Sequence, residues 1–195
     1  VNVEQVSDFA SMFENGYNLE TINLDNFVTS NARMMGGMFI NCQKLKEINL
    51  RKFVTDDVKN MNGMFKSCSS LTNIDLSNFK TNYVEDMDEM FLSMRHLTSL
   101  DLSSFETPRL RTMEGMFRSL ESCEKIIFTK KFDTSQVTNM RYLFFEDKVL
   151  TSLDLSNFQT ESVIDMSYIF SSCEKLVSLD LKSWKTPKAQ SMKSL

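Results

Sequence analysis

The chain has 195 residues, of which 42% are hydrophobic and 25% are charged, as is usual for a folded soluble protein. Its net charge of -4 argues against nucleic acid as a partner and against an anchor on anionic lipid, because both need a basic surface. No apolar run approaches the roughly 18 residues of a membrane-spanning helix, so we expect no direct membrane insertion in this segment. The first residues do not resemble a signal peptide either.

An internal repeat of 26 residues organises the chain from its first copy, which starts at Val6. In the third copy the recurring residues are Val58, Met61, Met64, Phe65, Cys68, Leu71, Ile74, Leu76, Phe79 and Thr81. Similar residues return at intervals of 26 in the other copies, which number about 7.5. Most of the 14 Met and 16 Phe fall into these columns. We interpret the columns as a stacked core, in which Met fills irregular gaps and Phe supplies buried area, rather than as a metal-binding or partner-binding stripe.

The first half of each unit predicts a short helix. In the third copy, the apolar residues from Val58 to Cys68 recur at the spacing of one helical face. The residue before the Met61 column is Asp, Asn, Thr or Ser in seven of eight copies, with Met34 as the exception, and these residue types cap helix N-termini. We therefore expect a helix of about two turns to start near this residue in every copy. The alternative start is the Thr column, where Pro108 follows a Thr and would suit a first helical turn.

The second half of each unit predicts a short strand. The alternation Ile74–Asp75–Leu76 places Ile and Leu inward and Asp outward. One unit cannot bury its own apolar face, whereas stacked units can. Strands of successive copies would then pair about 4.8 Å apart as a parallel sheet on one face.

Three segments carry a resemblance to a known family. Leu71–Thr81 (LTNIDLSNFKT) and Leu150–Thr160 (LTSLDLSNFQT) resemble the BspA-like leucine-rich repeats, also known as the Mycoplasma lipoprotein-associated repeat. Val163–Cys173 resembles the other half of that repeat, and the match covers essentially the whole chain. The resemblance implies a bacterial, less often protist, surface protein associated with adhesion to host components or to other cells, and not an enzyme. The family has no shared ligand motif, so no binding residue is carried over.

The expected fold is therefore an α/β leucine-rich-repeat solenoid of about 7.5 repeats of 26 residues, each a short strand plus a short helix, with a parallel sheet on one face. We expect residues 1–195 to form a single solenoid domain that is an excerpt of a longer array.

The outward positions of the expected strands form a polar column. Its members are Asn23, Asn49, Asp75, Asp101, Ile127, Asp154 and Asp180. Like charges stacked about 4.8 Å apart repel modestly in water. The four aspartates are candidates for binding a cation, a basic segment or sugar hydroxyls. The alternative, which we favour, is a solvated face that keeps the sheet soluble. A calcium site is disfavoured, because the column lacks clustered oxygen ligands.

The fifth copy departs from the repeat in sequence, charge and length. Ile127 interrupts the acidic column, Lys125, Lys130 and Lys131 flank it, and one extra residue precedes Phe132. These residues form either a ligand patch with an apolar centre and a basic rim, or a tolerated bulge. Both interpretations stay open, and the strand register is uncertain in this copy.

Residue types typical of catalysis or metal binding are sparse. Cys42 and Cys68 share a column in adjacent copies, where they could form a disulfide or, as we favour, remain two buried thiols. Cys123 replaces a core Leu, and the single His96 cannot complete a metal site. Phosphate-loop, metalloprotease and nucleophile-elbow motifs do not occur. We therefore expect no enzyme activity, no metal and no cofactor.

These features together predict an extracellular or cell-surface recognition and adhesion module that binds a protein or glycan partner through the solenoid face, since solenoids present extended surfaces. The partner would be a host or neighbouring-cell component, and the surface location is implied by the resemblance alone. The alternative is a structural spacer or stalk with the ligand site elsewhere. An intracellular scaffold with reduced thiols is a third reading.

Overall fold

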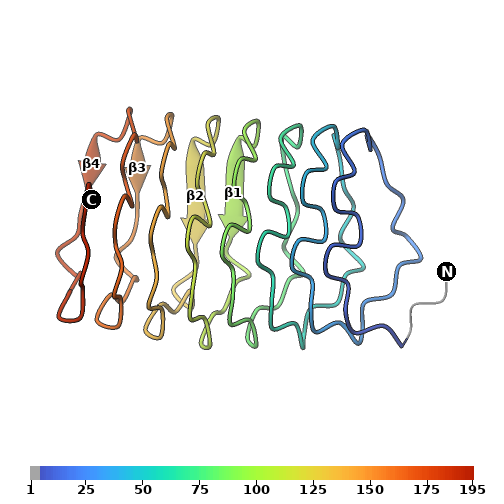
Figure 1. Cartoon of the computed structure of the whole chain (residues 1–195), viewed down its shortest axis with the longest axis horizontal. Coiled ribbons are helices and arrows are strands. Elements are labelled where there is room, and N and C mark those ends of the chain that lie inside the picture. Colours follow the sequence, from blue (N-terminus) through green and yellow to red (C-terminus); the bar gives the residue numbers. More distant parts are fainter. Residues whose placement is uncertain (1–4) are drawn as a thin grey trace.

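The computed structural model describes residues 5–195 and shows coils stacked side by side along one axis (Figure 1). The described chain starts at one end of the stack and finishes at the other. Isolated parallel bridges join equivalent residues of successive copies, from Asp8 and Met34 at the start to Asp165 and Ser191 at the end. Each bridge joins residues 26 positions apart, except the one between copies five and six, which spans one residue more.

Four short strands lie on one side of the stack. They are β1 (Ser99–Leu102), β2 (Lys125–Phe128), β3 (Ser152–Leu153) and β4 (Ser178–Leu179). Among residues 5–195 they form two separate two-stranded sheets, in which β1 pairs with β2 and β3 with β4, both in parallel. Exposed and buried residues alternate along β1, with the two leucines inward and the serine and aspartate outward. The single continuous sheet that we expected is therefore interrupted.

The expected helices are absent from residues 5–195, where each is replaced by a run of turns. In the third copy every second N–H group bonds to the next copy. These donors are Met61, Gly63, Phe65 and Ser67, and the acceptors are the carbonyls of Asp86, Asp88, Met90 and Leu92. The N–H groups of Met64, Lys66 and Cys68 bond three residues back along the chain, to the carbonyls of Met61, Gly63 and Phe65. The α/β prediction of a strand plus a helix in each unit was thus wrong, because half of the backbone donors leave the coil instead of closing helical turns.

The spacing of the coils explains this correction. The ring centroids of Phe39 and Phe65 lie 5.7 Å apart, and those of Phe65 and Phe91 lie 6.1 Å apart, with nearly parallel planes. Packed helices need roughly 8–10 Å between their axes. Coils that stack at the distance of stacked rings therefore leave no room for a helix in each copy.

Left-handed backbone conformations mark the same segments. Within residues 5–195, the residues of positive φ fall into two columns four positions apart: Ser11, Gly37, Gly63, Glu89, Gly115, Tyr142, Tyr168 and Ser194 in one, and Asn15, Asn41, Ser67, Ser93, Ser119, Glu146 and Ser172 in the other. A right-handed helix cannot include a left-handed residue in every turn. The expected N-cap residues are reused: the Asn60 side chain accepts the N–H of Asn62 (3.0 Å), which closes a turn rather than a helix end.

The core lies between the two sides of each coil. Met61, Met64 and Phe65 are fully buried, and their columns stay buried from the second copy through the sixth, whereas Met12 of the first copy is 45% exposed. This burial confirms the interpretation of the Met and Phe columns as core. The described residues contain no helix of the length and hydrophobicity needed to cross a membrane.

A ladder of buried threonines ties the copies together. The Thr81 hydroxyl donates to the Glu106 carbonyl (2.8 Å) and accepts the Glu106 N–H (3.0 Å). Thr55 bonds to Lys80 in the next copy in the same way. One hydroxyl therefore satisfies a donor and an acceptor of the neighbouring coil inside the core.

The extra residue of the fifth copy lies in the turn after β2. The register of β2 is regular, since Leu100 pairs with Ile126 and Leu102 with Phe128. Phe128 occupies a position that is Leu in the neighbouring copies, and its ring meets those of Phe132 and Phe158 edge-on at 5.0 and 5.1 Å. The larger ring and the longer turn thus occur together.

Candidate binding face

The candidate surface is the strand face, by which we mean the outward side chains at the strand positions of all copies and the turns that follow them. Its aspartates have a local structural role. Asp75 Oδ1 accepts the N–H and the hydroxyl of Ser77 (3.1 and 2.6 Å), and Asp154 accepts the same groups of Ser156 (3.0 and 2.6 Å). Each carboxylate closes the turn after its strand position. The polar column is therefore needed for the coil geometry, whatever else it binds.

The same contacts fix the charge of the column. The Ser77 hydroxyl lowers the pKa of Asp75, and the Ser156 hydroxyl lowers the pKa of Asp154. The pKa of Asp180 is lowered by the N–H of Lys182. Asp101 accepts the N–H of the residue two positions on (2.8 Å) in the same arrangement. Hydrogen bonds to the ionised form favour it, so Asp75, Asp154 and Asp180 stay charged at neutral pH.

The patch predicted around the fifth copy is only partly assembled. Ile127 is half-buried and lies opposite Asp101 in the parallel register, while Lys125 and Lys130 are exposed. Lys131 forms an ion pair with Glu106, so its charge is compensated within the chain. All three lysines are exposed beside the half-buried Ile127, but only Lys125 and Lys130 form no ion pair among residues 5–195.

The hollows on this side of the stack include two of more than about 400 Å³. One of about 510 Å³ is lined by Glu124, Lys125, Val149, Thr151, Ser152 and Lys175, and thus includes a predicted candidate residue. The other, of about 420 Å³, lies over the first three copies between Thr21 and Asp75. Of the residues that line the second hollow, sequence reasoning named only Asp75 as a binding candidate, because no residue there departs from the repeat.

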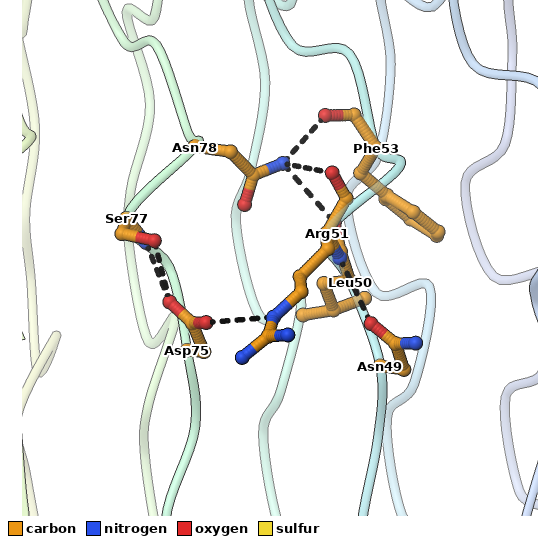
Figure 2. Close-up of polar contacts among 7 residues, drawn as sticks. All are labelled: Asn49, Leu50, Arg51, Phe53, Asp75, Ser77 and Asn78. Atoms are coloured by element: carbon orange, nitrogen blue, oxygen red, sulfur yellow. Dashed lines mark hydrogen bonds and ion pairs between the residues drawn. The ribbon is translucent and has the colours of Figure 1, made fainter.

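Contacts between neighbouring coils shape this second hollow (Figure 2). Arg51 Nε donates to Asp75 Oδ2 (3.4 Å), and the Arg51 N–H bonds to Asn49 Oδ1 (3.2 Å). Asn78 Nδ2 donates to the carbonyls of Leu50 (3.1 Å) and Phe53 (2.8 Å). Arg51 and Asp75 are both exposed at their charged ends, so they present charge on the surface of two adjacent copies.

The described residues contain no group of three or more His, Cys, Asp or Glu side chains that could hold a metal ion. Cys42 and Cys68 are free thiols, which donate to the carbonyls of Phe13 and Phe39. Burial raises the pKa of both thiols. A buried, protonated thiol is a poor nucleophile. His96 Nδ1 lies at a hydrogen-bonding distance of 2.6 Å from a backbone carbonyl oxygen, so this ring nitrogen already has a partner within the chain.

Sequence reasoning also missed a buried acid. Asp147 occupies the column of Cys68, Leu120 and Cys173 and is 1% exposed. Its Oδ1 accepts the Leu120 N–H (2.8 Å), whereas its Oδ2 is buried without a hydrogen-bond partner among the described residues. Burial raises the pKa of this carboxyl well above its usual value. The signal was an acidic residue in an apolar column of the sixth copy.

Comparisons with known proteins give one family. The family model described as "Mycoplasma protein of unknown function, DUF285" matches residues 1–49 and 121–195, which together are more than half of the chain. The crystal structure of a leucine-rich cell surface protein from Faecalibacterium prausnitzii is similar, with a TM-score of 0.49 and 18% sequence identity. The similarity covers 82% of this chain and 37% of that protein, so the chain spans well under half of its length. No curated protein matches. The chain belongs to the family of Mycoplasma proteins of unknown function known as DUF285.

Proposed function

We propose that this chain is a recognition module of a cell-surface protein, which binds a protein or glycan partner through the strand face. The observation that carries the proposal is that this face is uncovered along the stack. Outward residues such as Asp75, Asp101 and Asp154 are exposed in copy after copy at one constant repeat position. Solenoids commonly use such extended faces for binding.

Rigidity supports a binding role. The turn of each aspartate is closed locally, and the Thr81 ladder connects the coils behind the face. Side chains that are already ordered lose little conformational entropy when a partner binds. The surface location and a role without catalysis both rest on the resemblance of Leu71–Thr81 to BspA-like repeats.

The test is surface plasmon resonance on the immobilised chain with panels of extracellular-matrix proteins and glycans. We expect at least one partner to bind, and we expect the double variant Ile127→Asp/Lys130→Glu to abolish that binding while the fold is retained. Lys59→Glu is the control, because Lys59 is exposed on the arm before the turn segment and its side chain has no ion pair among residues 5–195.

Each outcome decides one point. If the double variant binds as well as the native chain, the fifth-copy patch is not the contact. If no panel member binds, the recognition function is wrong and the array is better described as a spacer.

A further inference from the structure

Backbone pairing at the strand positions differs along the stack. β1 pairs with β2 and β3 with β4, but the equivalent segments 21–24, 47–50 and 73–76 of the first three copies form no strand. The N–H and carbonyl groups of Ile48 and Asn49 have no hydrogen-bond partner within residues 5–195. Backbone polar groups need partners, so these groups are open to water or to a ligand.

The hollow of about 420 Å³ lies over this unpaired stretch. Small-molecule sites typically occupy roughly 300–1,000 Å³. The half-buried side chains of Ile22 and Ile48 supply the apolar part of the lining. The polar part consists of Thr21, Glu47, Asn49, Arg51, Asn73 and Asp75. Figure 2 shows Arg51 and Asp75 reaching toward each other from neighbouring coils, with Asn49 beside them.

We propose that this hollow binds a neutral sugar unit of a glycan. The proposal rests on the recognition function and names the ligand class of that function. A sugar offers hydroxyls that both donate and accept hydrogen bonds, together with apolar C–H faces. The lining offers both kinds of partner: carboxylate and carbonyl acceptors, guanidinium, amide and N–H donors, and two isoleucine side chains.

The charge and the geometry of the hollow argue against two other classes of ligand, which are anions and extended peptides. Glu47 and Asp75 place two carboxylates against the single cation of Arg51, so an anionic ligand such as a sulfated sugar is disfavoured. An extended peptide adds to the free edge of a sheet. Segment 47–50 has a neighbouring coil on each side, at 21–24 and 73–76, so it offers no such edge.

The experiment is an amide NMR titration of the ¹⁵N-labelled chain with three neutral tetrasaccharides built from glucose, mannose or galactose. We expect one of them to shift the amide signals of 21–24, 47–50 and 73–76 in a saturable way. The Arg51→Ala variant should bind about tenfold more weakly, as expected for loss of a charged hydrogen bond. The Arg51 side chain is exposed, so its removal should leave the fold intact.

Lys182 provides the matched control. It occupies the position of Arg51 in the seventh copy and lines a smaller hollow of about 250 Å³, where Leu153 pairs with Leu179. The Lys182→Ala variant should bind like the native chain. The proposal is overturned if none of the tetrasaccharides shifts these amides, or if both variants lose affinity equally. A protein partner captured on the panel without any sugar binding would refute this inference alone and leave the recognition function standing.

Discussion

Replacement of Asp147 by Asn is expected to stabilise the chain at alkaline pH and to change its stability little at acid pH. In this column the thiols of Cys68 and Cys173 donate to phenylalanine carbonyls of the preceding copy. Asp147 Oδ1 instead accepts the Leu120 N–H, which in other copies bonds three residues back. The carbonyl freed in this way is that of Phe117, and the Asn amide can donate to it while its oxygen keeps the Leu120 bond.

The direction of this pH dependence follows from the pKa of Asp147. Burial raises the folded-state pKa of Asp147 well above that of the unfolded chain, which is about 3.9. The stability that the neutral acid contributes is fully present below about pH 4 and is lost as pH rises through the raised folded pKa. The buried Oδ2 has no partner in the described chain, and an unsatisfied buried polar group costs about 1–3 kcal/mol, more when it is charged. We therefore expect native and variant chains to diverge by at least about 1–3 kcal/mol between pH 4 and pH 9.

Urea unfolding of both chains across this pH range measures the difference. Asp88, whose pKa burial raises to about 6, titrates equally in both chains and cancels in the comparison. Because repeat arrays can unfold in parts, the hydrogen-exchange protection of the Leu120 amide gives a local reading at the joint between copies five and six. Identical pH profiles of the two chains would refute the reasoning.

Two further predictions concern the coils themselves. The Thr81→Val variant keeps the shape of the side chain but leaves the Glu106 N–H and carbonyl without their buried partner. Urea unfolding should therefore show a free energy of unfolding lower by about 2–4 kcal/mol. A decrease below about 0.5 kcal/mol would contradict the role of the threonine ladder. The Gly115→Ala variant places a side chain at φ +57°, and the nearest atom to the new Cβ, on Arg118, is 3.7 Å away. The expected loss of about 1 kcal/mol in the free energy of unfolding therefore comes from the backbone conformation alone. Thermal unfolding measures this loss, and an unchanged melting temperature would contradict it.

The repeat and the core were predictable because they depend on residue type and spacing. Met61 and Phe65 are large, apolar and periodic, and such columns can only be satisfied by stacking. The outward place of Asp75 followed from alternation alone. Its contact with Ser77 could also be inferred, since Asp commonly accepts the N–H two residues on.

The helix was mispredicted because the same apolar spacing suits two backbones. A face of residues at intervals of three and four can be buried by a helix, or by a coil whose alternate N–H groups bond to its neighbours. Gly37, Gly63 and Gly115 were the available signal, since glycine within a short expected helix is unfavourable and three copies share it. Serine, glutamate and tyrosine at the same position in other copies hide that signal, although they adopt the same left-handed conformation.

Recognition by a repeat array depends on where its copies differ. In the regular copies the buried polar groups bond to the backbone of the next coil, as Thr81 does to Glu106, and such buried groups have nothing left to offer a partner. Within residues 5–195 the strand face departs from this regularity beside Ile127, where an extra residue follows β2 and β2 does not pair with β3, and at the unpaired backbone around Ile48. The departure beside Ile127 changes the sequence, so the sequence alone revealed it. The departure around Ile48 changes only the backbone pairing between coils whose sequences fit the repeat, so the sequence did not reveal it. A search for the ligand site of a regular solenoid should thus compare backbone pairing from copy to copy as well as side chains.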